Sequence, residues 1–473
     1  MAEMVVDKGT VKIRMYNTEF GDCFLLGFKP DSKKTRYMLI DFGMYHTTEN
    51  GTEKLKAVAE NIKEDTGGIL DLLVITHEHT DHILGFRRAN EVFSEIRVKK
   101  LWMSWMEEYG DPKVEEIKFA RNLCISGLRS ALTGLKANAG MMSEKVEHLL
   151  GFEGDDDDFN NLAADGDYDP SEGKPGSNRQ TMIWLKHYCD DFDYLKAGET
   201  PPPCEGFDNV NFYVLGPPSP ENLEYMHREG DTDTPGTETY LSADLNDPYL
   251  RFASQLAEDQ SGKPGLFNGK YEDTEKAGIP AVIYQRENGN WRDLDNMNTE
   301  AIGDLALKLN RHTNNTSLVL AIELGDNGKV LLFPGDAEIG NWLSWDILEW
   351  ETPNGKITKE DLLKRMVFYK TGHHGSINAT LKDKGLELAE SPDLAAMIPV
   401  SREMAKKNDW DIPYGELVKA LMDKCRGRVL RSDDSLPEET DKPDNIGSGE
   451  WKEFIKSIKT SKGMVYRDFV IEW

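Results

Sequence analysis

The sequence predicts an α/β fold whose functional residues follow directly after strands. Two observations lead to this prediction. Short runs rich in β-branched and aromatic residues alternate with segments of helical periodicity, starting with three strands, a helix and a fourth strand before residue 80. Three such runs along the chain are followed at once by clusters of His and Asp. Ligand sites at the carboxyl ends of strands are typical of α/β sheets.

The N-terminal part contains three short β-rich runs, at 11–16, 23–28 and 37–41, with turn-prone residues between them. This spacing predicts an antiparallel meander. Residues 53–65 then have helical periodicity, and Gly67-Gly68 follows them. The next run, Leu72-Leu73-Val74-Ile75, is typical of a buried strand.

Three histidines and an aspartate follow this buried strand within six positions, in the pattern His-x-His-x-Asp-His. His77 and His79 alternate in an extended backbone, so their rings can point the same way, whereas Asp81 and His82 at the turn can face a second ion. Neutral imidazole and carboxylate suit Zn²⁺, and also Mn²⁺ or Fe. The chain has only 10 histidines, which makes a chance cluster in a surface loop the weaker interpretation.

Between residues 98 and 218 the sequence predicts strands, helices and one long polar loop. We expect a strand over 98–104, helices over 115–150 and 179–195, and a strand over 210–215 that ends at Gly216-Pro217-Pro218. Residues 151–176 are rich in Asp, Gly and Asn and include the acidic run Asp155–Asp158. That composition predicts a solvated loop.

Two more clusters follow strands in the C-terminal part. The runs 318–322 and 330–333 are joined by a turn containing Asn327-Gly328, which predicts a hairpin, and Gly335-Asp336 follows it. The run 367–370 leads to His373-His374. Adjacent side chains of an extended backbone point opposite ways, so one histidine of this pair is expected to be a ligand and the other to face substrate.

Composition limits the kinds of partner. The net charge is −28, and about −22 of it lies within residues 141–308. A chain this acidic does not hold duplex nucleic acid by a broad basic face. No apolar run approaches the roughly 18 residues of a membrane span, and the first residues lack the features of a signal peptide, so we expect a soluble, cytoplasmic protein. Five widely spaced cysteines without a Cys-x-x-Cys pair argue against structural disulfides.

The three clusters, taken in order, resemble the signature of the metallo-β-lactamase fold superfamily. Asn314-Asn315-x-Ser317, Gly21-Asp22-Cys23 and His373-His374-Gly375-Ser376 are similar to the metallo-β-lactamase domain of ComEC-type competence proteins and of phosphorylcholine esterases. The resemblance covers about 1–110 and 310–435.

This resemblance implies a fold and a division of the chain. The expected fold is a four-layer αββα sandwich, with residues 1–110 as its N-terminal half and 310–473 as its C-terminal half. Residues 111–309 would be largely an acidic insertion or cap, in which 210–217 is a candidate core strand. The membrane-spanning part of competence proteins has no counterpart here, so a role in DNA import is not implied.

The resemblance also implies a ligand set. One ion would lie on His77 and His79 and a second on Asp81, His82 and His373, with Asp336 bridging the two. Asp81 and His374 would be the catalytic residues, His374 as the substrate-facing acid. His312 lies near the place of a further superfamily ligand but is offset by about one residue, so it is a ligand, a loop histidine or a residue that contacts substrate. Asp41 either steadies the histidine loop or is a plain turn residue.

These residues predict a hydrolase with two divalent ions, Zn²⁺ or Mn²⁺, that activate a water. The resemblance favours a phosphodiester substrate, such as a nucleic-acid strand or end, a nucleotide or another small phosphodiester. A metallohydrolase of carbon esters, lactones or amides is an alternative. A second alternative is a protein whose acidic insertion binds a partner protein while the metal site is regulatory.

The charge distribution predicts weak duplex binding. Only a few basic residues, including Arg87, Arg88, Arg311 and Lys370, neighbour the three clusters. We therefore expect little duplex DNA bound at about 150 mM salt, where phosphate contacts are already much weakened. Fluorescence anisotropy with labelled duplex and single-stranded oligonucleotides measures this, and tight duplex binding at that salt would contradict it.

Overall fold

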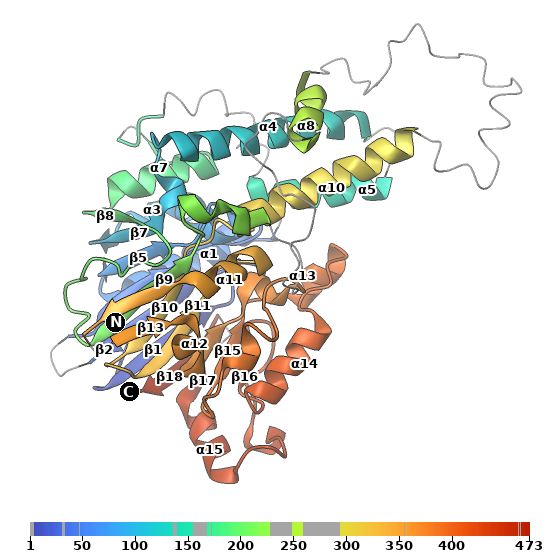
Figure 1. The fold of residues 1–473 in the computed structure, drawn as a ribbon. Coiled ribbons are helices and arrows are strands. Elements are labelled where there is room, and N and C mark those ends of the chain that lie inside the picture. Colours follow the sequence, from blue (N-terminus) through green and yellow to red (C-terminus); the bar gives the residue numbers. More distant parts are fainter. Residues whose placement is uncertain are drawn as a thin grey trace, which may run out of the picture. The chain divides into compact units, whose positions relative to one another are not determined.

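The computed structural model (Figure 1) describes the chain except residues 1–3, 31–33, 47, 136–139, 155–167, 172, 228–247, 259–293, 354, 462 and 464. The acidic run Asp155–Asp158 lies outside the described residues. Two compact units are formed, the first by Met1–Tyr109, Gly154–Glu238 and Thr313–Trp473 and the second by Gly110–Glu153 and Thr239–His312. The expected boundaries after 110 and 309 lie near two of these joins, whereas 154–238, expected in the insertion, belongs to the first unit.

The first unit contains an eight-stranded mixed sheet with the order β17-β18-β1-β2-β3-β5-β7-β8. Its strands are β1 (Thr10–Tyr16), β2 (Phe24–Lys29), β3 (Arg36–Ile40), β5 (Leu72–Ile75), β7 (Leu101–Ser104), β8 (Phe192–Leu195), β17 (Ile458–Thr460) and β18 (Tyr466–Glu472). The predicted meander is confirmed, because β1, β2 and β3 pair antiparallel. From β3 onward the pairing is parallel, with Ile40 opposite Val74 and Val74 opposite Trp102.

A six-stranded mixed sheet in the same unit has the order β16-β15-β14-β11-β10-β9. Its strands are β9 (Val210–Gly216), β10 (Val319–Leu324), β11 (Lys329–Phe333), β14 (Met366–Lys370), β15 (Ala395–Ile398) and β16 (Val429–Arg431). The predicted hairpin is confirmed by the antiparallel pair β10–β11, and Asn327 in its turn has φ of 56°. Strands β11, β14, β15 and β16 are parallel, so their carboxyl ends meet at one edge.

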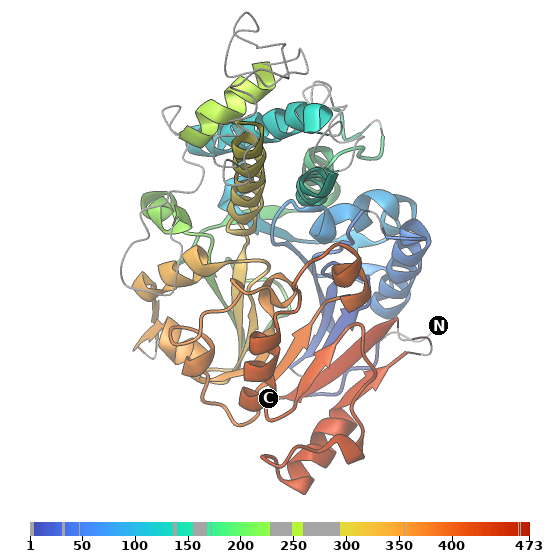
Figure 2. The ribbon, with the colours of Figure 1, turned by 90° about the vertical axis from the view of Figure 1, so that its right-hand side faces the viewer.

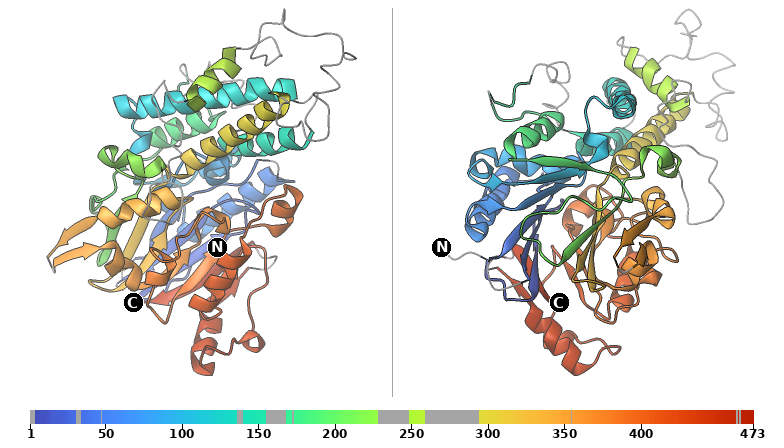
Figure 3. Two further views of the ribbon diagram at one scale, coloured as in Figure 1. Left: turned by 45° about the vertical axis from the view of Figure 1, so that its right-hand side comes forward. Right: turned by 60° about the vertical axis from the view of Figure 1, so that its left-hand side comes forward.

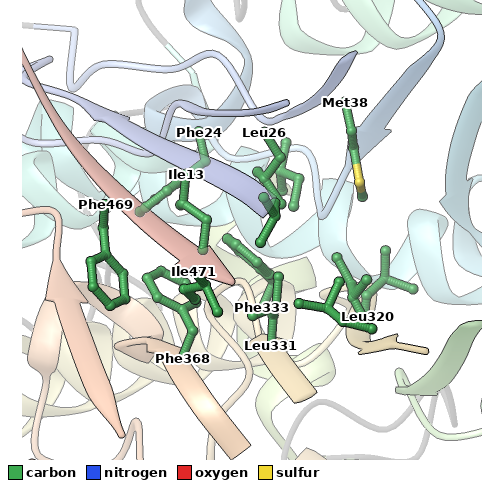
Figure 4. Packing of buried hydrophobic residues seen from close by; sticks show 14 of the residues in the cluster. Ile13, Phe24, Leu26, Met38, Leu320, Leu331, Phe333, Phe368, Phe469 and Ile471 are labelled. Carbon is green, nitrogen blue, oxygen red and sulfur yellow. The ribbon is translucent and has the colours of Figure 1, made fainter. Parts of the chain in front are cut away.

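The two sheets share one apolar core (Figures 3 and 4). Ile13 and Phe24 come from the eight-stranded sheet, and Leu320 and Phe333 from the six-stranded sheet, and all four are buried. The rings of Phe24 and Phe333 meet edge to face with centroids 5.7 Å apart. Because side chains alternate along a strand, one face of each sheet is used for this core and the opposite face is left for helices.

Helices cover these opposite faces (Figure 2). Those against the eight-stranded sheet are α1 (Gly51–Thr66), α2 (Thr80–Arg88), α3 (Asn90–Phe93) and α7 (Asn178–Tyr188). Leu55, Val58 and Ile62 of α1 share a second apolar cluster with Leu39 and Leu73 of the sheet. The helix expected over 53–65 is thus confirmed.

Helices also lie between strands of the six-stranded sheet along the chain. They are α11 (Ile339–Ser344), α12 (Lys359–Lys364), α13 (Arg402–Lys407) and α14 (Gly415–Lys424). Trp342 of α11 packs edge to face on Tyr369, with ring centroids 6.3 Å apart. Tyr369 follows the core residue Phe368 along β14, so it points to the opposite face of the sheet.

Smaller elements complete the first unit. They are the pair β4 (Ile69–Leu70) and β6 (Arg97–Val98), the pair β12 (Glu349–Thr352) and β13 (Gly355–Thr358), and α15 (Ser448–Ser457). The helix expected over 179–195 was wrong in length. It ends at Tyr188, and Phe192–Leu195 forms the edge strand β8, because Asp190 and Asp191 interrupt the helical pattern and the residues after them alternate in polarity.

The second unit is helical in its described residues. It contains α4 (Pro112–Leu135), α5 (Gly140–Glu153), α8 (Pro248–Glu258) and the part of α10 (Leu294–Asn314) up to His312. Helix α4 packs against α5 and α8, and at Gly127 a Cβ would lie only 2.4 Å from the carbonyl oxygen of Ala253. Arg121 pairs with the buried Glu153 at 2.6 Å. Within the described part of the chain, no helix combines the length and the apolar character that crossing a bilayer requires.

The packing of the shared core predicts how two substitutions change the free energy of unfolding. Phe333→Ala removes a side chain that is only 2% exposed at the contact between the two sheets, so it should lower the free energy of unfolding by about 3–5 kcal/mol. Phe192→Ala, at a position 39% exposed on the edge strand, should cost less than about 1 kcal/mol. Urea unfolding followed by tryptophan fluorescence compares the two, and equal losses would contradict this account of the core.

Candidate metal centre

The carboxyl ends of four strands meet at one place in the first unit. Asp41 follows β3, and the histidine loop follows the neighbouring parallel strand β5. Asp336 follows β11, and His374 follows the neighbouring parallel strand β14. The backbone N–H of Leu318 donates to the carbonyl of Thr76 at 2.8 Å, which ties the two sheets together at this edge.

Four buried side chains from three of these loops form a group that can hold a metal ion. They are Asp81, His82, Asp336 and His374, each no more than 1% exposed. His374 Nε2 lies 2.8 Å from Asp81 Oδ2 and 3.7 Å from Asp336 Oδ2. His82 Nε2 lies 3.2 Å from Asp336 Oδ2 and 3.7 Å from Asp81 Oδ2. Two imidazole nitrogens therefore face two carboxylates across a few ångströms.

His77 and His79 lie beside this group, as the sequence indicates. His77 Nε2 is 3.0 Å from His79 Nδ1, and both side chains are buried. The ring of His77 packs on that of His82, with centroids 4.1 Å apart. Burial, and then the neighbouring imidazoles of His82 and His79, hold the pKa of His77 well below its usual value, which keeps this ring neutral and able to act as a ligand.

Hydrogen bonds at the far nitrogens orient three of the histidines. His82 Nδ1 donates to Asp41 Oδ2 at 2.8 Å, and His374 Nδ1 donates to the carbonyl of Pro399 at 2.8 Å. His77 Nδ1 lies 3.2 Å from the Ser317 hydroxyl. With Nδ1 engaged, Nε2 of His82 and of His374 is left for the group at the centre, which is the arrangement that metal-binding histidines usually have.

Asp41 steadies the histidine loop. Its Oδ1 accepts a hydrogen bond from the Thr76 backbone N–H at 2.8 Å and its Oδ2 one from the Thr76 hydroxyl at 2.7 Å, in addition to the bond from His82. Asp41 itself has φ of 55°, a left-handed conformation that aims its carboxylate across to the neighbouring strand end. Of the two alternatives that the sequence leaves for this residue, the structure shows the first.

Some buried polar atoms at the centre lack hydrogen-bond partners among the described residues. They include Oδ1 of Asp81 and Nε2 of His82, the latter in spite of its 3.2 Å separation from Asp336. Burying such atoms without partners costs free energy. A divalent cation satisfies both a carboxylate oxygen and an imidazole lone pair, so the donor set fits a metal ion.

The charges of the group partly compensate one another. Burial alone would raise the pKa of Asp336, but the imidazole of His82 and the ammonium of Lys370 hold it well below the usual range. Burial would lower the pKa of His82, but the carboxylates of Asp336, Asp81 and Asp41 raise it well above its usual value. The surplus of carboxylates over cations thus attracts positive charge to this place.

His373 and His374 occupy places opposite to those expected. The expectation assumed an extended backbone, but the two residues have φ of 41° and 51°, so the alternation of side chains does not hold. His374 is fully buried within the group, whereas the side chain of His373 is 14% exposed. His373 Nδ1 lies 3.5 Å from Glu338 Oε1, and the Asn314 amide lies 3.4 Å from its Nε2. Burial lowers the pKa of His373 to about 4.

His312 does not join the group. Among the described residues, the sets of His and Asp side chains that can hold a metal do not include it. Helix α10 continues to Asn314, so His312 is a buried helical residue of the second unit rather than a residue at a strand end. Ser317, which follows this helix, instead contacts His77 and accepts a hydrogen bond from the Asp336 N–H at 3.1 Å.

The sequence-based set omits three residues that belong to the centre. Lys370, at the end of β14, forms an ion pair with Asp22, and both are buried. Glu338 is buried behind His373 and accepts hydrogen bonds from the amides of Asn314 and Asn378. The motif Gly21-Asp22-Cys23 was a signal for Asp22. Lys370 has no comparable signal in the sequence, because a lysine at the end of a strand is most often exposed.

Comparisons with protein-family models, with curated proteins and with solved structures find no match for this chain.

A glycine makes the approach of the two strand ends possible. At Gly43 a Cβ would lie 2.0 Å from the carbonyl carbon and oxygen of Asp81 and 2.1 Å from the His82 nitrogen. Gly43→Ala should therefore displace the start of α2, lower the melting temperature and reduce metal content. The control is Gly449→Ala, since no atom lies within 4 Å of its added Cβ and Ala favours the helix by about 0.5–1 kcal/mol. Unchanged metal content in folded Gly43→Ala would contradict the geometry.

Proposed function

We propose that this chain is a hydrolase of the metallo-β-lactamase fold that uses two divalent ions. The observation that carries the proposal is the meeting of four strand ends at one group of buried His and Asp side chains, with the far nitrogens of three histidines engaged by oxygen atoms. Two mixed sheets with a shared core and helices on their outer faces support the four-layer αββα arrangement.

The contacts favour a revised ligand set. His77 and His79 would hold one ion, and Asp81, His82 and His374 the other, with Asp336 between them. This set differs from the expected one in His374, which replaces His373, and in the omission of His312. Imidazole and carboxylate ligands suit Zn²⁺ and Mn²⁺. When bound, two such ions acidify a water for attack and stabilise charge at the centre that is attacked.

Neighbouring residues of the chain orient the histidine rings of the proposed site. Asp41 and Pro399 hold the rings of His82 and His374 by their Nδ1 atoms. His373 is the member of its pair that reaches the surface of the site, and Glu338 and Asn314 hold its ring in place. His373 is therefore the residue that would contact a phosphoryl oxygen or the leaving group.

A phosphodiester is the substrate class that the proposal favours, because two ions match the in-line displacement at phosphorus. A strand end, a nucleotide or another small phosphodiester would fit this class. Carbon esters, lactones and amides need the same nucleophile, so they belong in the same activity screen. The cytoplasmic location and a protein partner for the acidic residues remain predictions.

A comparison of three histidine variants tests the ligand set. His374→Ala should lose bound metal and activity together, because it removes a buried member of the group. His373→Ala should keep about two ions per chain but lower kcat by roughly 10²-fold or more, the range for a lost hydrogen-bond donor to charge that develops in the transition state. The exposed His187 gives the control, and His187→Ala should match the wild type. Elemental analysis after Zn²⁺ or Mn²⁺ loading and kinetics on bis-p-nitrophenyl phosphate measure both effects.

Three results would count against the proposal. A folded wild type that retains only trace metal after loading would refute the metal centre. Loss of metal in His373→Ala with retention in His374→Ala would restore the ligand assignment expected from the sequence. Hydrolysis of a lactone panel with no turnover of any phosphodiester would keep the metallohydrolase but change the substrate class.

A further inference from the structure

Lys370 is a buried cation beside the proposed ligands. Its side chain is 1% exposed, and its ammonium forms an ion pair with Asp22. It also donates to the carbonyl of Gly335 at 2.8 Å and lies 3.3 Å from Asp336 Oδ1. A buried ammonium needs such partners, because its desolvation costs several kcal/mol.

The contact with Lys370 determines which carboxylate oxygen of Asp336 faces the histidines. Oδ1 is turned to the ammonium, while Oδ2 lies 3.2 Å from His82 Nε2 and 3.7 Å from His374 Nε2. The N–H of Asp336 donates to the Ser317 hydroxyl at 3.1 Å, which fixes the same residue from its backbone side. One carboxylate oxygen is thus presented to the centre and the other is held back.

We propose that the ammonium of Lys370 engages one carboxylate oxygen of Asp336, so that only the other oxygen is available to a metal ion. The positive charge of Lys370 also weakens the affinity of the centre for divalent ions. Asp22 offsets part of this effect by pairing with the same ammonium. The inference rests on the proposed function, because it requires the group around His82 and His374 to bind metal. Lys370 is a positioning residue here, since it would act through Asp336 and through its charge.

If Lys370 had a purely structural role, its removal would affect metal binding differently. If Lys370 only neutralises buried carboxylates for folding, then removing either Lys370 or Asp22 would loosen the site and weaken metal binding in both cases. If Lys370 opposes metal binding, the two removals act in opposite directions. Lys370→Met frees Asp336 Oδ1 and removes a positive charge, whereas Asp22→Asn leaves the ammonium to pair more strongly with Asp336.

The experiment measures Zn²⁺ affinity by competition with a chromophoric chelator at fixed pH, on the full-length chain. Lys370→Met should bind Zn²⁺ at least about 10-fold more tightly, because it removes the repulsion between a buried positive charge and a divalent ion. Asp22→Asn should bind Zn²⁺ more weakly, and the double variant should return toward the wild type. Melting temperatures of the metal-free forms monitor folding.

Lys359 provides a matched control. It too is 1% exposed and forms an ion pair, with Asp346, but neither residue belongs to the group that can hold a metal. Lys359→Met should lower the melting temperature and leave Zn²⁺ affinity unchanged. If Lys370→Met does not fold, the comparison of Asp22→Asn with the double variant still tests the idea, because adding Lys370→Met should then tighten Zn²⁺ binding.

The two possible failures are distinguishable. If the wild type binds only trace Zn²⁺, the proposed function fails and the inference with it. If the wild type binds Zn²⁺ but Lys370→Met binds it equally or more weakly in a folded protein, the inference is overturned and the proposed metal centre stands. The inference is also overturned if Lys359→Met changes the Zn²⁺ affinity as much as Lys370→Met does.

Discussion

Burial of four carboxylates at one junction between two sheets is the constraint on which the candidate site depends. Asp22, Asp41, Asp81 and Asp336 are each no more than 2% exposed. A buried carboxylate costs several kcal/mol unless charged or hydrogen-bonding partners compensate for lost water. Asp41 obtains such partners from Thr76 and His82, and the other three obtain them from Lys370 and the histidines. Oδ1 of Asp81 has no hydrogen-bond partner among the described residues, so it can still bind a cation.

The position of these carboxylates is set mainly by backbone contacts. The N–H of Asp22 donates to the carbonyl of Asp81 at 2.9 Å, and the N–H of Phe42 donates to the carbonyl of His82 at 2.8 Å. Gly43 permits this approach because a side chain there would overlap the Asp81 backbone. The candidate ligands are consequently held by hydrogen bonds between strand ends, which do not depend on a metal ion. A site built on such rigid elements already has its geometry before a ligand binds.

Much of this site could be predicted from local sequence. The pattern from His77 to His82 follows a strand of four apolar residues, and strand ends in α/β folds are where ligands gather. Asp336 was found by the same reasoning. What failed was the inference of side-chain direction for His373 and His374, since their left-handed backbone angles are not visible in the sequence. His312 was considered because of its spacing, but the helix runs two residues past it.

Partners from distant parts of the chain could not be predicted in this way. Lys370 and Asp22 are far apart in sequence, and only the packing of the two sheets places the ammonium against the carboxylate. A lysine at the end of a strand is most often solvent-exposed, so its type alone carries no signal of burial. Glu338 is a similar case, because its role depends on the amide of Asn314 at the end of α10 and on that of Asn378 in another loop.

The acidic character of the chain is compatible with the proposed phosphodiester substrate, because exposed charges far from the site have little effect on a small substrate. At physiological ionic strength, charges farther apart than about 8 Å are largely screened when they are exposed. The buried cation Lys370 and the histidines, in contrast, act over a few ångströms in a medium that screens them weakly. The net charge of −28 therefore governs the approach of long polyanions more than it governs chemistry at the site. A substrate with one or two phosphoryl groups is repelled far less than a duplex, so the charge distribution favours the small members of the proposed substrate class.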